Sequence, residues 1–189
     1  MDPATDKVIE LALVKFEYSR ESGAIGRVFD TYDGLEDPGM QIPPESTAIH
    51  HITDAMVADA PPFADIAAML LDKLRGRLLI AHNVRFDYGF LKNEFKRLNL
   101  PFRSEVLCTV KLSRLLYPQH FKHSLDSIIA RHGIVQAERH RALADADALY
   151  QFLQQAIAEH GQAEVEAQAA VLMAAPAAPP GIDPEVVEQ

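Results

Sequence analysis

Side chains that could do chemistry lie close together near residue 140. His140 stands five residues before Asp145, and only small or apolar residues, Ala142 to Ala144, separate Arg141 from Asp145. An imidazole can take a proton from water, and a carboxylate can hold a hard cation. The spacing is compatible with metal-assisted hydrolysis. Taken alone, however, the stretch favours an ordinary helix start with a solvated acidic face.

An apolar pattern with helical spacing follows this stretch, and Gly161 is a plausible stop. His140 is therefore expected at the mouth of a helix and Asp145 about one and a half turns inside it. Asp145 and Asp147 are two residues apart, so they point about 200° away from each other on a helix. The alanines around Asp145 leave room for a ligand and favour it over Asp147. The residues of the pattern are Leu149, Phe152, Leu153, Ala156 and Ile157.

A second group of polar residues follows the short apolar strand predicted at 78–82. His82 and Asn83 stand at the end of that strand, where ligands often bind in α/β proteins. Asp87 lies at the start of the next predicted helix. It is either a ligand for a metal or a first-turn acid that stabilises the helix. These residues alone leave both interpretations open.

The order of the predicted elements indicates the fold class. Two strands at 8–16 and 27–32 form a hairpin, and helices then alternate with short strands. Ser124 and Gly133 are the expected ends of a helix over 125–132. This order predicts an α/β fold, with a mixed sheet flanked by helices. Residues 1–160 are predicted to form the domain, and residues 161–189, rich in Ala and Pro, a tail or linker.

Charge and cysteine content narrow the class of protein. The chain has 189 residues and a net charge of −9, yet residues 70–141 carry 14 Lys or Arg against 6 Asp or Glu. A basic segment of this kind can bind phosphates although the whole chain is acidic. One cysteine, Cys108, excludes an internal disulfide and fits the cytoplasm. No apolar run is long enough to cross a membrane.

Four motifs, in order, resemble those of the DEDDh 3′-5′ exonucleases, and in particular the proofreading epsilon subunits of bacterial DNA polymerase III. The segment 81–91 (AHNVRFDYGFL) resembles the second exonuclease motif, and 140–146 (HRALADA) resembles the third. The segments 49–53 (IHHIT) and 124–128 (SLDSI) also match. The resemblance covers residues 2–157 and implies an RNase H-like fold.

The resemblance also implies roles for individual residues. Asp87 and Asp145 would be metal ligands for Mg²⁺ or Mn²⁺, held as a two-ion site in the family, and His140 would be the general base. The substrate would be a single-stranded DNA 3′ end, cut during proofreading or repair to release nucleoside 5′-monophosphates. Partners would be DNA polymerase III subunits or a fused GIY-YIG nuclease domain. The implied substrate-binding residues are His82, Asn83, Phe86, His50 and Thr53.

Two departures from the family pattern are visible. The first motif, Asp-x-Glu-Thr-Thr-Gly, does not occur in these residues, so the first strand and two of four metal ligands are expected to be absent. That loss would leave one flank of the strand at 8–16 unpaired, and it permits an alternative function. The chain could be a non-catalytic module that binds nucleic acid or a polymerase. His51 stands where the family usually has Gly.

Overall fold

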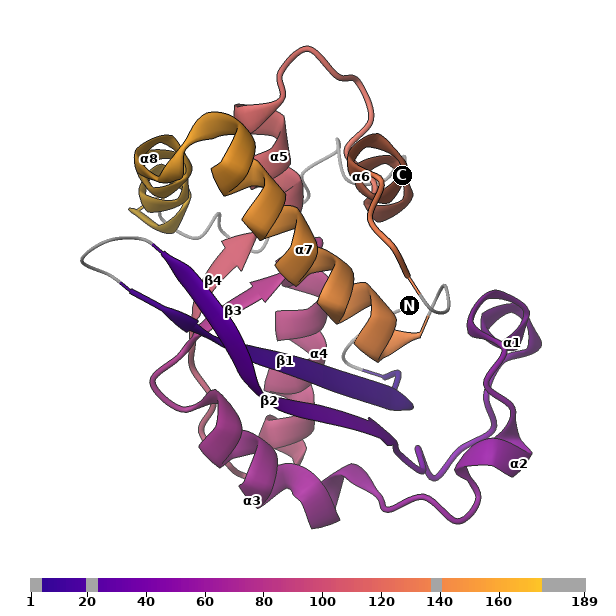
Figure 1. Cartoon of the computed structure of the whole chain (residues 1–189). Coiled ribbons are helices and arrows are strands. Elements are labelled where there is room, and N and C mark those ends of the chain that lie inside the picture. The colour runs from indigo at the N-terminus through magenta and orange to yellow at the C-terminus, as the bar shows by residue number, and fades with distance from the viewer. Residues whose placement is uncertain (1–4, 20–23, 137–140, 175–189) are drawn as a thin grey trace.

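The computed structural model describes residues 5–19, 24–136 and 141–174 (Figure 1). Short strands and helices alternate after an N-terminal hairpin, as the sequence predicts. The elements in chain order are β1 (Glu10–Tyr18), β2 (Ile25–Leu35), α1 (Pro44–His50), α2 (Asp54–Val57), α3 (Phe63–Leu74), β3 (Leu78–Ala81), α4 (Val84–Arg97), β4 (Glu105–Cys108), α5 (Thr109–Leu116), α6 (Leu125–His132), α7 (Ala142–His160) and α8 (Gln162–Ala174).

The hairpin β1–β2 is antiparallel and forms a sheet of its own. Its register runs from Glu10 opposite Leu35 to Tyr18 opposite Ile25, with irregularities around Phe16. Helix α7 packs against the hairpin, while β1 residues also share a core with α3 and α4, on the other side in Figure 1. Within the described residues β1 pairs with β2 alone. The expected unpaired flank of β1 is therefore confirmed for that part of the chain.

The second sheet, β3–β4, is parallel, with Leu78 opposite Glu105 and Ala81 opposite Cys108. Parallel neighbours need a crossover connection, and α4 provides it. Because α4 begins at Val84, directly after β3, Asp87 lies in its first turn. The two sheets are not hydrogen-bonded to each other within the residues described.

The ends of α6 and α7 test two predictions made from the sequence. Ser124 accepts a hydrogen bond from the Ser127 amide, and Gly133 closes α6 with φ 60°, as predicted. Helix α7 begins at Ala142, so Asp145 lies in its first turn rather than one and a half turns inside. His140 lies outside the described residues.

Helix α8 occupies residues that the composition assigned to a tail. Its Val165 and Ala169 are buried in the same core cluster as Phe152 and Leu107. Alanine favours helices, and the small apolar side of α8 packs against α5, α7 and β4. The packed part of the chain therefore extends beyond residue 160, to Ala174. None of the described helices combines the length and the apolar character needed to cross a bilayer.

Candidate active site

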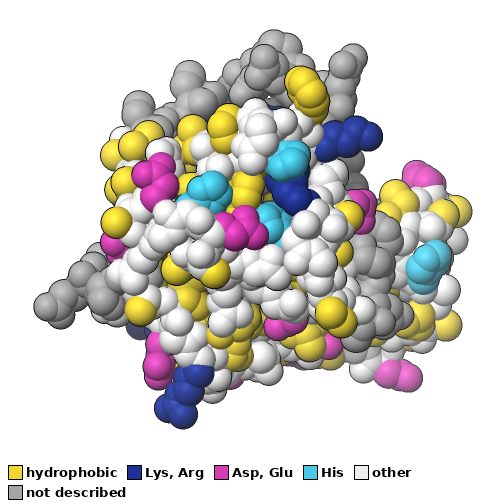
Figure 2. Space-filling view, turned by 45° about the horizontal axis from the view of Figure 1, so that its top comes forward, with side chains coloured by type: hydrophobic (Ala, Val, Ile, Leu, Met, Phe, Trp, Pro, Cys, Tyr) yellow, Lys and Arg dark blue, Asp and Glu magenta, His cyan; other side chains and the backbone are white. Residues whose placement is uncertain are grey.

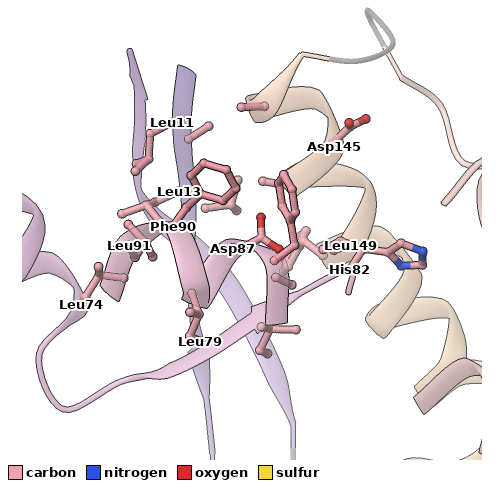
Figure 3. A pocket seen from close by; sticks show the side chains of 18 of the residues that line it. Leu11, Leu13, Leu74, Leu79, His82, Asp87, Phe90, Leu91, Asp145 and Leu149 are labelled. Atoms are coloured by element: carbon pink, nitrogen blue, oxygen red, sulfur yellow. The ribbon is translucent and has the colours of Figure 1, made fainter. Parts of the chain in front are cut away.

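A cavity of about 980 Å³ separates the two sheets, and both predicted metal ligands line it. Asp87 reaches it from the first turn of α4, and Asp145 from the first turn of α7 (Figure 3). Most of the other labelled side chains in this view are apolar, among them Leu11, Leu79 and Leu149. Two carboxylates far apart in the sequence thus line the same, mostly apolar space.

Asp87 is a carboxylate in an apolar setting. Burial raises its pKa from 3.8 to about 6, and a hydrogen bond to backbone partly opposes that shift. Removal of water disfavours the charged form, so a nearby cation would lower the pKa again. A carboxyl group with a perturbed pKa inside a cavity is a common mark of a functional site.

Asp145 differs from Asp87 because a neighbouring amide already contacts it. The Nε2 group of Gln136 donates to its Oδ1 at 3.1 Å and to the Ala144 carbonyl oxygen at 3.0 Å. In Figure 3 the Asp145 carboxylate points away from Asp87. Asp147 does not line the cavity and accepts a bond of 2.6 Å from Gln151. The predicted preference for Asp145 over Asp147 agrees with this placement.

Glu10 is an acid of the site region for which the sequence suggested no role. Its Oε1 accepts from Nε of Arg141 at 2.7 Å, and its Oε2 accepts from the Ala142 amide at 3.1 Å. It therefore satisfies a free N–H of the α7 N-terminus and fixes the turn that carries Asp145. The only signal for it in the sequence is a single acid in an otherwise apolar strand.

Replacement of Glu10 by alanine is expected to lower the free energy of unfolding by about 2–3 kcal/mol. Removal of Glu10 takes one ion-pair partner from Arg141 and leaves a helix N–H without its acceptor. The Glu10 side chain is only 8% exposed, whereas Glu17 of the surface pair with Arg27 is 57% exposed. Urea unfolding of Glu10→Ala beside Glu17→Ala measures the difference. Equal, small losses in both variants would contradict this role.

His82 lies at the end of β3 as a neutral side chain. Burial lowers its pKa to about 4. Its Nδ1 lies 3.1 Å from Oγ1 of Thr109, and that hydroxyl donates to the Ala81 carbonyl oxygen at 3.2 Å. A hydrogen bond to the His123 backbone opposes part of this lowering of the pKa. His82 is therefore held by two other segments at the lining of the cavity.

The remaining predicted substrate-binding residues divide into two groups. His50 and Phe86 line the cavity, whereas Asn83 and Thr53 do not. Phe86 is 40% exposed and its ring lies 4.8 Å from that of Phe90. His50 Nδ1 accepts from the Ile52 amide at 3.0 Å.

Backbone conformation explains one departure from the family pattern. His51 has φ 60° and ψ 12°, in the left-handed region that favours glycine. Histidine is among the residues that tolerate this region better than most. A residue other than glycine thus stands in a conformation that favours glycine, and Asn83 has a similar conformation at φ 61°.

The donor set fits a hard divalent cation only in part. Carboxylate oxygens are the ligands that Mg²⁺ and Mn²⁺ prefer. In the described part of the chain, however, no three His, Cys, Asp or Glu side chains converge closely enough to hold an ion. Asp87 and Asp145 can contribute to a metal site but do not complete one.

Another set of polar side chains lies elsewhere, over helices α5 to α8. Figure 2 shows histidines gathered around acids on this face. Tyr117 donates to Glu159 at 2.8 Å, His132 lies 3.2 Å from the same carboxylate, and the His160 ring packs on Tyr117. The contacts tie the ends of α6 and α7 to α5. These residues pack helices and do not line the cavity.

Comparison with known proteins decides the family. The profile of the exonuclease family (RNase T) matches residues 1–153. The chain belongs to this exonuclease family. Its relatives include an epsilon-like protein of DNA polymerase III from Rhodobacter capsulatus, 39% identical over 142 residues, which are 74% of this chain and 20% of that protein. The epsilon subunit of Haemophilus influenzae is 34% identical over 148 residues, 75% of this chain and 55% of the subunit.

Solved structures confirm the RNase H-like fold. Exonuclease X, in complex with 5′ overhanging duplex DNA, superposes with a TM-score of 0.60 at 23% identity, over 87% of this chain and 94% of its own. The nuclease domain of 3′hExo, described as a DEDDh family member bound to rAMP, superposes with a TM-score of 0.59 at 14% identity, over 85% of this chain and 96% of its own. The chain spans between a tenth and about half of the polymerase III relatives. The family in general depends on divalent metal ions.

Proposed function

We propose that this chain is the catalytic domain of a metal-dependent 3′-5′ exonuclease that releases nucleoside 5′-monophosphates from single-stranded DNA ends. The observation that carries the proposal is the placement of Asp87 and Asp145 on one cavity, from two motifs 58 residues apart. Membership of the exonuclease family supports the same activity.

The proposed roles follow from chemistry. Asp87 and Asp145 would contribute ligands to divalent cations, and such cations, when bound, would supply stabilisation of negative charge at the phosphate. His140 takes a proton from the attacking water, since an imidazole titrates near neutral pH. His82 and Phe86 contact the terminal nucleotide, with the Phe86 ring packed on a base. His50 and Thr53 lie on the segment around α1 and α2 and are proposed to contact the same nucleotide.

A labelled oligonucleotide tests the activity. A 5′-labelled DNA strand is incubated with Mg²⁺ and the chain extended at its N-terminus by a strand that carries Asp-x-Glu. Stepwise shortening from the 3′ end is the expected result. Internal cuts contradict the proposal, and the absence of any product favours a non-catalytic binding module. Matched RNA measures the preference for DNA.

For residues 1–189 by themselves, we predict at most one weakly held Mn²⁺. Two close cations repel each other unless enough negative charge surrounds and bridges them, and only Asp87 and Asp145 of the implied ligands are present. Because a proton competes for Asp87, the affinity is expected to rise with pH up to about 6 and then to level off. Calorimetric titration between pH 5 and 8 measures this, with Asp147→Asn as the control. Two tight sites would contradict the prediction.

Phe86→Ala is expected to weaken binding of single-stranded DNA by about 5- to 100-fold, since stacking on one base is worth about 1–3 kcal/mol. Phe121→Ala is the matched control, because Phe121 is fully exposed and does not line the cavity. Fluorescence anisotropy with a labelled oligonucleotide measures both variants. If the two lose affinity equally, Phe86 does not contact a base.

The partners follow from the relatives. Several relatives are subunits of DNA polymerase III, and we propose that this chain acts beside a polymerase, in proofreading or repair in the cytoplasm. A fused GIY-YIG nuclease domain stays a prediction from the Pro-rich segment at 178–184.

A further inference from the structure

Positive and negative charge are separated along the chain. Residues 28–72 contain nine Asp or Glu and no Lys or Arg, whereas residues 70–141 contain 14 Lys or Arg. A protein with a net charge of −9 can therefore still present one basic surface. Helix α4 carries part of this basic charge, and all of its residues are described.

The outer side of α4 offers one kind of chemistry. Its two acids do not reach that side, since Asp87 lines the cavity and Glu94 is buried. The exposed side chains of the helix are those of Arg85, Phe86, Lys92 and Lys96. The exposed surface of α4 thus combines positive charge with an aromatic ring.

The three basic residues form a stripe along the helix. Steps of seven and four residues separate Arg85, Lys92 and Lys96, so that they differ by about 40° or less around the helix axis. Along the axis they extend over about 16 Å. Gly89, on the same side between Arg85 and Lys92, adds no side chain. We call Arg85, Lys92 and Lys96 the α4 basic stripe.

Ion pairing distinguishes this stripe from the other basic residues around α4. Arg97 and Lys7 both approach the buried Glu94 carboxylate, at 2.8 Å and 3.8 Å. No described residue forms an ion pair with the α4 basic stripe. The charges of the stripe are therefore left to interact with an anion from outside the described residues.

The stripe begins beside the candidate active site. Helix α4 follows β3 directly, and its first turn contains Arg85 together with Phe86 and Asp87, which both line the cavity. Lys92 and Lys96 lie about 10 Å and about 16 Å further along the helix from Arg85, which continues away from the end of β3 (Figure 1). A polymer with its end in the cavity can therefore place its preceding units along the stripe.

We propose that the α4 basic stripe binds the phosphates of the nucleotides that precede the 3′-terminal one in a single strand of DNA. This inference rests on the proposed function, because it takes the 3′ end to occupy the cavity. Guanidinium and ammonium groups both bind phosphate, Arg85 as a planar fork and the two lysines as point charges. Phosphate contacts carry no base information, so the stripe adds affinity for strands of any sequence.

The salt dependence of binding tests the stripe. Each phosphate contact with a single strand contributes a slope of about −0.7 to the plot of log K against log salt concentration. The double variant Lys92→Gln, Lys96→Gln is therefore expected to have a slope less steep by about 1.4, and to bind a ten-nucleotide strand at least ten times more weakly at low salt. Fluorescence anisotropy with the 189-residue chain, without divalent ions, measures both quantities.

The matched control replaces two exposed basic residues away from α4, Arg27→Gln with Arg75→Gln. It is expected to change the slope by much less than the stripe variant. An equal change in the two double variants overturns the proposal, because the binding would then follow net charge alone. An unchanged slope in the stripe variant overturns it as well.

Strand length separates the stripe from the cavity. A labelled dinucleotide reaches the cavity but not Lys92 and Lys96, so the stripe variant is expected to bind it as the unmodified chain does. A loss by the same factor for the dinucleotide and the ten-nucleotide strand overturns the proposal, since it indicates a disturbed cavity.

The stripe and the exonuclease activity can fail separately. If the chain extended by the first motif shortens DNA while the stripe variant keeps its salt slope, the stripe proposal is wrong and the activity stands. If the stripe variant loses slope and affinity as expected while the extended chain forms no product, the exonuclease proposal is wrong and the stripe stands.

Discussion

Replacement of His140 by alanine, in the chain extended by the first motif, is expected to lower exonuclease turnover by about 10²–10⁴-fold, the usual contribution of a general base. Affinity for Mn²⁺ is expected to stay nearly unchanged, because the imidazole takes a proton and does not bind the ion. Single-turnover digestion of a labelled strand measures the rate, and calorimetry measures the ion.

Asp87→Ala is the contrasting variant. It is expected to lower the rate at least as much as His140→Ala and also to weaken Mn²⁺ binding, since Asp87 is a carboxylate at the cavity. Asp147→Ala is the matched control, because this acid lies in the same helix as Asp145 but outside the cavity. If His140→Ala abolished Mn²⁺ binding while Asp87→Ala left it intact, His140 would be the metal ligand and Asp87 would not.

Local signals predicted the elements that carry the site. A nearly continuous apolar run indicated β1 and an apolar pattern with helical spacing indicated α3, while the cap Ser124 with Gly133 marked both ends of α6. Helix geometry showed that Asp145 and Asp147 cannot face the same site, and the alanines around Asp145 favoured it over Asp147. These features depend on residues within a few positions of one another, so one sequence is enough to predict them.

The same local patterns could not predict contacts between residues far apart in the sequence. The bonds between Glu10 and residues 141–142 join segments 131 or more positions apart, and no local rule pairs them. They also provide an acceptor for the N–H of Ala142, the first residue of α7. Helix α8 was assigned to the tail because Ala-rich composition resembles a linker, whereas its stability comes from packing of Val165 and Ala169.

Glu36 is the clearest residue that sequence reasoning missed. It follows β2 in a stretch that was expected to be a loop, yet its side chain is fully buried. Neither carboxyl oxygen has a hydrogen-bond partner among the described residues. Burial, together with the nearby charges of Glu10 and Glu94, raises its pKa to about 8. The carboxyl group is therefore mostly protonated in the folded protein at pH 7.

This shift makes stability depend on pH. Between about pH 4.5 and pH 8 the folded state binds a proton that the unfolded state has released. The free energy of unfolding must then fall as pH rises through this window, and it levels off above pH 8. At 1.36 kcal/mol per pKa unit the full loss is at most about 4–5 kcal/mol, and local relaxation reduces it to about 2–4 kcal/mol.

Glu36→Gln is expected to remove this dependence, because glutamine keeps the shape but cannot ionise. The free energy of unfolding is expected to rise by about 2–4 kcal/mol at pH 8.5 and to change little at pH 4.5, since the carboxyl group is neutral in the folded state at low pH. Urea unfolding at pH 4.5, 6.5 and 8.5 measures the trend, with Glu45→Gln as the control because Glu45 is exposed. The prediction is contradicted if the free energies of unfolding of Glu36→Gln and the unmodified chain differ by the same amount at every pH. That result would show that Glu36 finds a partner for its charge.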